Sequence, residues 1–207
     1  MDYDYKYGNT YYKYFSDCGI KLTKYDLVAP KQSQDLQPGL EYKMYPRPIF
    51  DNVNYKGSDK LKGKGAIITG GDSGLGRTCA IYFVKEGAKV VIPYLNEDID
   101  ALETKEYIEK LGGECLLLKG DITDKNFSKK IVNETLNTFG KIDILVNNAG
   151  VQYQTDYLED ISDEQFDKTM KVNVYGMFYL TREVLPHLKS GSSDITITIT
   201  LSTTSSL

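Results

Sequence analysis

From about residue 61 onward, short apolar runs alternate with longer stretches of mixed polarity. The apolar runs are nearly continuous, as is typical of parallel strands that helices cover on both faces. Alternating elements of this size predict an α/β fold with a doubly wound parallel sheet, in the strand order 3-2-1-4 with a fifth strand beside strand 4. The pattern predicts strands at residues 66–69, 89–92, 115–119 and 142–147, and helices at residues 75–86, 98–111 and 125–139.

Two later segments extend this pattern. Ser162 and Gln165 have the spacing of a capping box, which predicts the start of a long helix that reaches about Lys189. Residues 195–201 alternate strictly between apolar and hydroxyl side chains and predict a fifth strand with one polar face. Pro93 follows the second predicted strand directly, and we expect it only at a strand end because proline cannot donate a ladder hydrogen bond.

Residues 1–60 differ in composition from the rest and hold ten of the 17 tyrosines. Because they lack sustained periodicity, we interpret them as a partly disordered N-terminal extension that lies outside the core of one domain, residues 61–207. Residues 36–55 are rich in proline and aromatic side chains, and we expect them to lie extended across the surface of that domain.

Composition narrows the classes of partner. The net charge of −4 and the isoelectric point near 5.2 do not favour binding to nucleic acid or to an anionic membrane. No apolar run approaches the ~18 residues needed to span a bilayer, and the N-terminus lacks the features of a signal peptide. Cys18, Cys79 and Cys115 lie far apart, which indicates reduced thiols rather than a disulfide framework or a metal site. We therefore expect a cytoplasmic protein without bound metal.

A glycine-rich turn joins the first predicted strand to the first predicted helix. Thr69, Gly70, Gly74 and Gly76 follow the pattern Thr-Gly-x-x-x-Gly-x-Gly. Glycines let the backbone approach a phosphate closely, and a helix N-terminus offers unpaired N–H groups and the positive end of a dipole. The turn predicts a site for the pyrophosphate of a dinucleotide, although the glycines alone also fit an ordinary tight turn.

Three further motifs follow in order: Gly120-Asp121-Ile122-Thr123, Asn147-Asn148-Ala149-Gly150 and Val172-Asn173-Val174-Tyr175-Gly176. With the glycine turn, they resemble the short-chain dehydrogenase/reductase family over residues 61–190. Gln37-Pro38-Gly39-Leu40-Glu41 and Tyr94-Leu95-Asn96-Glu97 resemble its bacterial glucose/ribitol-dehydrogenase-like branch, whose members carry a similar extension. The resemblance implies a Rossmann-like fold and an NAD(P)-dependent oxidoreductase that acts on a CH–OH/carbonyl pair of a sugar, polyol or aldehyde.

The resemblance also implies which residues contact the cofactor. Asp121 is expected to accept the adenine amino group, and Asn147 to lie where the nicotinamide ribose passes at the carboxyl edge of the sheet. Taken alone, Asp121 also fits a helix cap and Asn147 a polar loop. The expected cofactor-binding residues are Thr69, Gly70, Ser73, Gly74, Leu75, Gly76, Tyr94, Asp121, Ile122, Asn147, Ala149 and Gly150.

The choice between NADP and NAD depends on the end of the second strand. An acidic residue there would bind the ribose 2′-hydroxyl and repel a 2′-phosphate. Tyr94 occupies about that place instead. Arg77, just after the last glycine, fits either a contact to a 2′-phosphate or an ordinary first-turn arginine. The sequence slightly favours NADP.

The catalytic residues are only partly recognisable. The resemblance implies a role for Asn173 and for a serine, here Ser205, placed by allowing about three inserted residues. The family also uses a tyrosine as acid/base with a lysine four residues later, and none of the 17 tyrosines has that lysine. The family-like sequence breaks between Ser193 and Asp194. We therefore expect a truncated member with little activity alone, or else a non-catalytic dinucleotide-binding protein or a nonfunctional fragment.

The expected truncation bears on association. Complete relatives are expected to be homo-oligomers, and the helix that carries Val174, Phe178 and Val184 would lose an apolar neighbour. An uncovered helix and an uncharged strand edge favour aggregation. We expect the isolated chain to be poorly soluble or to depend on association.

Overall fold

The computed structural model describes residues 33–197 except residues 36, 46, 154 and 156. Its centre is a parallel sheet of five strands in the order β3-β2-β1-β4-β5, which confirms the predicted doubly wound topology. The strands are β1 (Gly65–Ile68), β2 (Lys89–Tyr94), β3 (Cys115–Lys119), β4 (Ile144–Asn147) and β5 (Ser193–Thr196).

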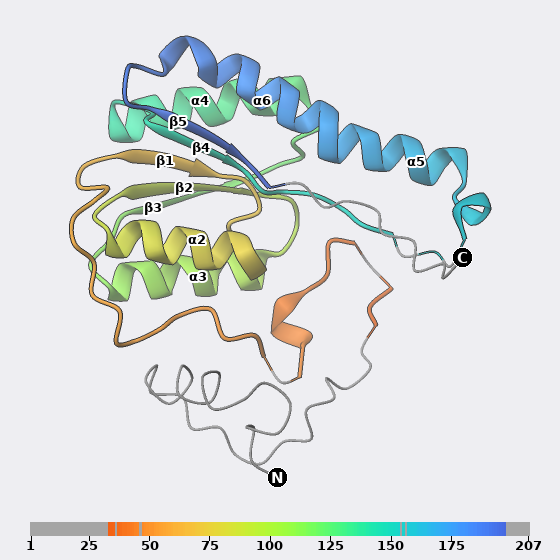
Figure 1. Ribbon diagram of the computed structural model, residues 1–207, viewed down its shortest axis with the longest axis horizontal. Helices are drawn as coiled ribbons and strands as arrows, with labels where there is room; N and C mark the ends of the chain where they lie inside the picture. The colour runs from red at the N-terminus through yellow and green to blue at the C-terminus, as the bar shows by residue number, and fades with distance from the viewer. Residues whose placement is uncertain (1–32, 36, 46, 154, 156, 198–207) are drawn as a thin grey trace.

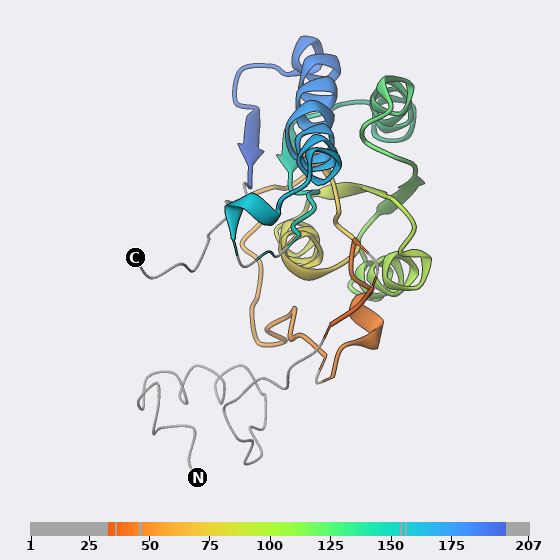
Figure 2. The ribbon, with the colours of Figure 1, turned by 90° about the vertical axis from the view of Figure 1, so that its right-hand side faces the viewer.

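Helices cover both faces of this sheet. Helices α2 (Gly74–Lys85) and α3 (Asp98–Lys110) lie on one face, and α4 (Lys125–Phe139) and α6 (Met177–Val184) lie on the other (Figures 1 and 2). None of the described helices has the length and apolar character that crossing a membrane requires.

The two faces bury separate hydrophobic clusters, because neighbouring residues of a strand point to opposite sides of the sheet. Ile68 packs with Ile81 and Ile108 under α2 and α3. Ile67 packs with Ile131 and Leu180 under α4 and α6. The strands are nearly continuously apolar because helices bury both of their faces, as the sequence pattern predicted.

Strand β2 is longer than predicted and contains Pro93, which pairs with Leu118 of β3. The Pro93 carbonyl accepts from the N–H of Gly70, 2.8 Å away. The N–H and C=O groups of one strand residue point to the same side of the strand. An N–H at position 93 would therefore point toward the glycine turn, beyond the end of β1. The proline therefore removes no ladder hydrogen bond, and the expectation that the strand ends before it is wrong.

The long predicted helix consists of successive helical segments. Ser162 caps the first, α5 (Asp163–Met170), by accepting from the N–H of Gln165 at 3.2 Å. A π-helical segment, η3 (Lys171–Gly176), joins α5 to α6, and a 3-10 turn, η4 (Leu185–His187), ends the series. The capping prediction is confirmed, and the π segment had no signal in the sequence pattern.

Strand β5 begins earlier than predicted. It starts at Ser193 and pairs with β4 from Ile144↔Ser193 to Asn147↔Thr196. All its residues are exposed. The predicted strand at residues 195–201 is wrong in its start, because backbone pairing with β4 extends to residues whose side chains do not alternate. Residues 198–201 lie outside the described residues.

The described part of the N-terminal extension lies against α2 and α3 (Figure 1). It contains a short 3-10 helix, η1 (Glu41–Lys43), anchored by the Asp100 carboxylate, which accepts from the N–H groups of Glu41 and Tyr42 at 2.8 and 2.9 Å. A second anchor is Glu86, which accepts from the N–H groups of Ser58 and Lys60. Residues 1–32 lie outside the described residues, so the partial disorder expected for the extension stays a prediction.

Arg77 joins the extension to the domain. Its side chain is buried and donates to Glu41 Oε1 at 2.6 Å, to Thr104 Oγ1 at 2.6 Å and to the backbone carbonyls of Asp72 and Asp100 at 2.9 Å. Arg77 lies in the first turn of α2 as one interpretation had it, but it is buried rather than an ordinary exposed arginine, and its guanidinium does not line the cavity where a 2′-phosphate contact would be needed. The guanidinium is occupied by partners far away in the sequence.

We expect Arg77→Met to destabilise the domain by about 3–5 kcal/mol, because it removes the buried counter-charge of the Glu41 and Asp100 carboxylates. Urea unfolding measures this loss. Arg47→Met is the matched control: Arg47 reaches the same carboxylates and Glu103 from the surface, with 39% of its side chain exposed, and should cost less than about 1 kcal/mol. Equal losses in the two variants would contradict the role of burial.

Candidate functional site

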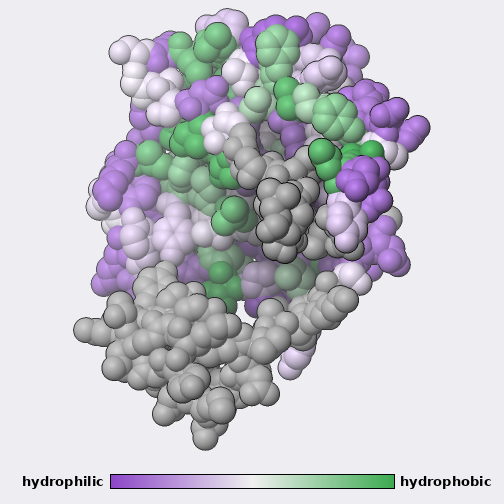
Figure 3. All heavy atoms as spheres, turned by 45° about the vertical axis from the view of Figure 1, so that its right-hand side comes forward, coloured by the Kyte–Doolittle hydropathy of each residue, from purple (hydrophilic) through white to green (hydrophobic). Residues whose placement is uncertain are grey.

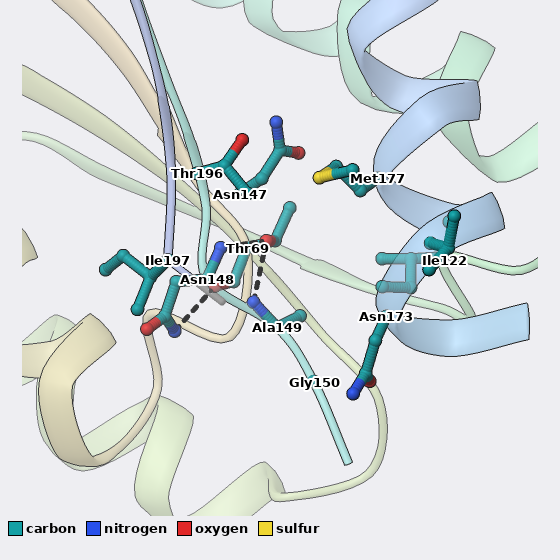
Figure 4. A pocket seen from close by; sticks show the side chains of 12 residues that line it. Thr69, Ile122, Asn147, Asn148, Ala149, Gly150, Asn173, Met177, Thr196 and Ile197 are labelled. Atoms are coloured by element: carbon teal, nitrogen blue, oxygen red, sulfur yellow. Dashed lines mark hydrogen bonds between the residues drawn. The ribbon is translucent and has the colours of Figure 1, made fainter. Parts of the chain in front are cut away.

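The candidate site lies at the carboxyl ends of the strands, where the chain order reverses between β1 and β4. Open α/β sheets bind their ligands at such a switch point. Two adjoining cavities of about 130 and 390 Å³ open here and share the walls formed by Ile122, Asn148, Ala149 and Gly150. Figure 4 shows the smaller cavity between the ends of β1 and β4 and the helical segment that carries Asn173 and Met177.

The glycine turn forms one wall of the larger cavity. Gly70 has a φ of 63°, and a Cβ atom there would lie 3.2 Å from Ala149 Cα. At Gly76 a Cβ atom would lie 2.0 Å from the Gly70 carbonyl oxygen. Gly70 and Leu75 line the larger cavity, whereas Gly74 and Gly76 line neither. Gly76 thus lets helix α2 pack closely against the turn.

A clamp between Thr69 and Asn148 fixes the turn relative to β4. Thr69 Oγ1 accepts from the N–H groups of Asn148 and Ala149, both at 3.0 Å. Asn148 Nδ2 donates to the carbonyls of Thr69 and Gly70 at 2.9 and 3.1 Å (Figure 4). The sequence reasoning assigned no role to Asn148, although its position in the Asn147-Asn148-Ala149-Gly150 motif could have indicated one.

The end of β2 lines the far part of the larger cavity through Pro93, Tyr94 and Leu95, together with Asp121 after β3. The Tyr94 hydroxyl donates to Asp98 at 3.0 Å, and burial together with this carboxylate raises the pKa of Tyr94 to about 12. Asp121 accepts from the N–H of Thr123 at 2.8 Å and is exposed. The helix-cap interpretation of Asp121 is wrong, because Asp124 caps α4, whereas the expected contact of Asp121 to an adenine stays a prediction.

Two buried carboxylates lie beside this part of the cavity. Asp72 and Glu97 are each 3% exposed, and both line the cavity. Burial, and next the charge of Glu97, raises the pKa of Asp72 to about 6. Glu97 Oε2 accepts from the N–H of Asn96, whereas Oε1 has no hydrogen-bond partner among the described residues. Neither carboxylate was singled out from the sequence.

The smaller cavity is lined by amide and apolar side chains. Asn147 donates through Nδ2 to Thr181 Oγ1 at 3.0 Å and to Asp194 Oδ1 at 3.2 Å, and its Oδ1 has no partner among the described residues. Asn173, in the π segment, binds both backbone groups of Val151 at 2.8 Å. Ser205 lies outside the described residues. Asn173 therefore positions the chain after β4 at the rim of the cavity.

The structure brings most of the expected residues to one continuous site. Ser73, Leu75, Tyr94 and Asp121 line the larger cavity, Thr69, Asn147 and Asn173 line the smaller one, and Ile122, Ala149 and Gly150 line both. Their roles toward a ligand stay predictions. The first N–H groups of α2 have no partner within the helix, so the glycine turn offers donors to an anion beside a cavity that extends toward amide side chains.

A parallel doubly wound sheet with a glycine turn at its switch point defines an α/β protein of the dinucleotide-binding class. The family model described as short chain dehydrogenase matches residues 64–205. The chain belongs to this family, as its motifs predicted.

Individual relatives are similar to this chain in sequence and structure. The chain is 52% identical over 167 residues to the uncharacterized oxidoreductase YhdF of Bacillus subtilis, covering 81% of this chain and 58% of that protein. It is 38% identical over 175 residues to the glucose and ribitol dehydrogenase of Daucus carota, covering 82% and 60%. A short chain dehydrogenase from Burkholderia cenocepacia in complex with NADP superposes with a TM-score of 0.63 at 31% identity, over 66% of this chain and 56% of that one. The chain thus spans less than two thirds of these proteins.

Asp72 should make stability depend on pH. Its pKa is raised from its ordinary value near 3.8 to about 6 in the folded state, so its stabilising contribution is full below about pH 4 and is lost as the pH rises through 6. The loss is on the order of 2–3 kcal/mol. Urea unfolding between pH 4 and 7 should show Asp72→Asn gaining that much stability relative to the parent.

The parent chain, unfolded in the same buffers, provides the control, and a slope of stability against pH that Asp72→Asn leaves unchanged would contradict the assignment.

Proposed function

We propose that this chain provides the dinucleotide-binding part of an oxidoreductase that interconverts a CH–OH group and a carbonyl. The observation that carries the proposal is the glycine turn, clamped by Thr69 and Asn148 at the wall of the larger cavity. A bound NAD or NADP would supply hydride transfer to or from the substrate carbon. The glucose and ribitol dehydrogenase among the relatives supports a sugar, polyol or aldehyde as the substrate.

The residues present fit such a cofactor. The backbone of the turn at Gly70 leaves the space that a side chain would fill, and the N–H groups of Leu75 and Gly76 start α2 without helical acceptors. These groups would hold the pyrophosphate. Tyr94 and Asp121 would border the adenosine half, and Asn147, whose Oδ1 has no hydrogen-bond partner among the described residues, would border the nicotinamide half.

NAD suits the charges around the cavity better than NADP. Arg77 is occupied by Glu41 and Asp100 and offers no contact to a 2′-phosphate. Asp72 and Glu97 place buried carboxyl groups beside the end of β2, where they would repel that phosphate and tolerate a 2′-hydroxyl. We therefore propose NAD as the cofactor, whereas the sequence slightly favoured NADP.

Catalysis by these residues alone is not part of the proposal. Asn173 uses both polar atoms of its side chain on Val151, and no tyrosine in the chain is followed by a lysine four residues later. A dinucleotide-binding protein without turnover is therefore the second candidate function.

Association is also proposed. Apolar side chains on α5, η3 and α6 are exposed, among them Phe166, Tyr175 and Phe178 at 54%, 46% and 55%. In the space-filling view, hydrophobic side chains form several patches on the upper part of the molecule, at the level of α6 and β5 (Figure 3). Such patches favour contact with another polypeptide.

Isothermal titration with NAD and NADP tests the proposed function. We expect NAD to bind more tightly than NADP, and we expect Gly70→Ala to weaken NAD binding at least tenfold, because its methyl group would press against Ala149. Gly112→Ala is the matched control: Gly112 also has a positive φ, 80°, but a Cβ atom there meets nothing within 4 Å and it lines neither cavity. Absence of binding to either dinucleotide would overturn the proposal.

Turnover by the 207-residue chain should be undetectable with panels of sugars, polyols and aldehydes. Loss of general acid–base catalysis alone typically costs ~10²–10⁴ in rate. Turnover is measured as the change in cofactor absorbance with time at saturating NAD or NADP. Turnover comparable to that of a full-length relative assayed in parallel would contradict this expectation and exclude the second candidate function.

A further inference from the structure

Part of the N-terminal extension lies at the larger cavity. Gln37 and Pro38 line it together with Ser73 and Leu75 of the glycine turn and with Leu95 after β2. Residues 37–44, here called the strap, connect these two wall residues to the buried Glu41. The strap belongs to the segment before residue 60 that the sequence placed outside the core and to which it assigned no chemistry.

We infer that the strap is part of the dinucleotide site and covers the adenosine half of the bound cofactor. This inference rests on the proposed function, because it concerns how the same cavity holds its ligand. It assigns Gln37 and Pro38 as cofactor contacts and Glu41 as a positioning residue.

The position of the strap along the cavity identifies the half of the ligand. In dinucleotide-binding sheets the segment formed by the end of the second strand and the residues just after it borders the adenosine ribose. Gln37 and Pro38 share their cavity with Tyr94 and Leu95 of that segment and with Asp121. The strap does not line the smaller cavity, where Asn147 and Asn173 lie. It therefore borders the adenosine half and leaves the nicotinamide half uncovered.

The chemistry of the two wall residues suits an adenosine. The Gln37 amide can donate to and accept from ribose hydroxyl groups. The Pro38 ring offers an apolar surface for the adenine face without adding charge. Because neither side chain is charged, this wall does not compete with the N–H groups of the turn for the negatively charged pyrophosphate.

Glu41 holds the strap and the glycine turn together. Its Oε2 accepts from the N–H of Gly74 at 2.6 Å, and its Oε1 accepts from Arg77 at 2.6 Å. Arg77 in turn donates to the Asp72 carbonyl within the turn at 2.9 Å. The strap is thus fastened to the turn at two backbone positions, so ordering one favours the order of the other, and by linkage a ligand that orders the turn orders the strap.

The test compares Gln37→Ala/Pro38→Ala with the parent chain by titration with NAD and with ADP, which contains the adenosine and the pyrophosphate but not the nicotinamide riboside. Both affinities should fall about tenfold by the same factor, because the removed contacts belong to that half. Ile49→Ala is the control within the same extension: Ile49 is 57% exposed and lines neither cavity, and its affinities should match those of the parent. Thermal unfolding without ligand should be unchanged in all variants.

Amide hydrogen exchange in the parent and in Gln37→Ala/Pro38→Ala provides a second measurement. NAD at equal occupancy should slow exchange in residues 39–44 more in the parent than in the double variant, which a strap ordered only through Glu41 would not show. If the parent binds no NAD, the proposed function fails. If the parent binds NAD while the double variant binds NAD and ADP within twofold of it, this inference alone is overturned.

Discussion

The burial of one guanidinium group determines how the rest of the site is arranged. Arg77 is 1% exposed, and an unpaired charge at that depth would cost several kcal/mol. Its partners come from three separate places: Glu41 in the extension, Asp72 in the glycine turn, and Asp100 with Thr104 on α3. No local segment can satisfy this arginine, so the turn, the helix and the extension must adopt their positions together. The extension is therefore a condition for the shape of the domain's glycine turn and not an appendage to it.

The same site depends on backbone groups more than on reactive side chains. Thr69 and Asn148 use their polar atoms to fix main-chain positions on either side of the switch point, and Asn173 does the same for Val151. Asn173 lies in the π segment η3, where the wider turn interrupts the regular helix, a departure that is common at functional sites. Rigid backbone at the edge of a parallel sheet is what a long, flexible dinucleotide requires for binding at low entropic cost.

Most of the fold could be predicted from the sequence because it rests on local patterns. The apolar runs fixed β1, β3 and β4 to within two residues, and Ser162 marked the start of α5. The predictions failed where contacts with residues distant in the sequence determine the local structure. Pro93 is accepted inside β2 because its nitrogen faces the glycine turn, where β1 has already ended, and Arg77 is held away from the cavity by Glu41, 36 positions earlier. Likewise the buried positions of Asp72 and Glu97 follow from tertiary packing, which single-residue reasoning does not see.

The negative carboxylate of Glu41 lies at the N-terminus of α2, where the pyrophosphate is also proposed to bind. A helix start attracts anions, and Glu41 already binds the N–H of Gly74 there. Four N–H groups begin a helix without internal acceptors, however, and they point in different directions around its axis. Gly74 faces the extension, whereas Leu75 lines the larger cavity. In the proposed complex the helix start is divided between two anions: the N–H of Gly74 binds Glu41 and holds the strap in place, and the donors on the cavity side would bind a pyrophosphate. Because Arg77 compensates the charge of Glu41, the bound carboxylate need not repel that second anion strongly.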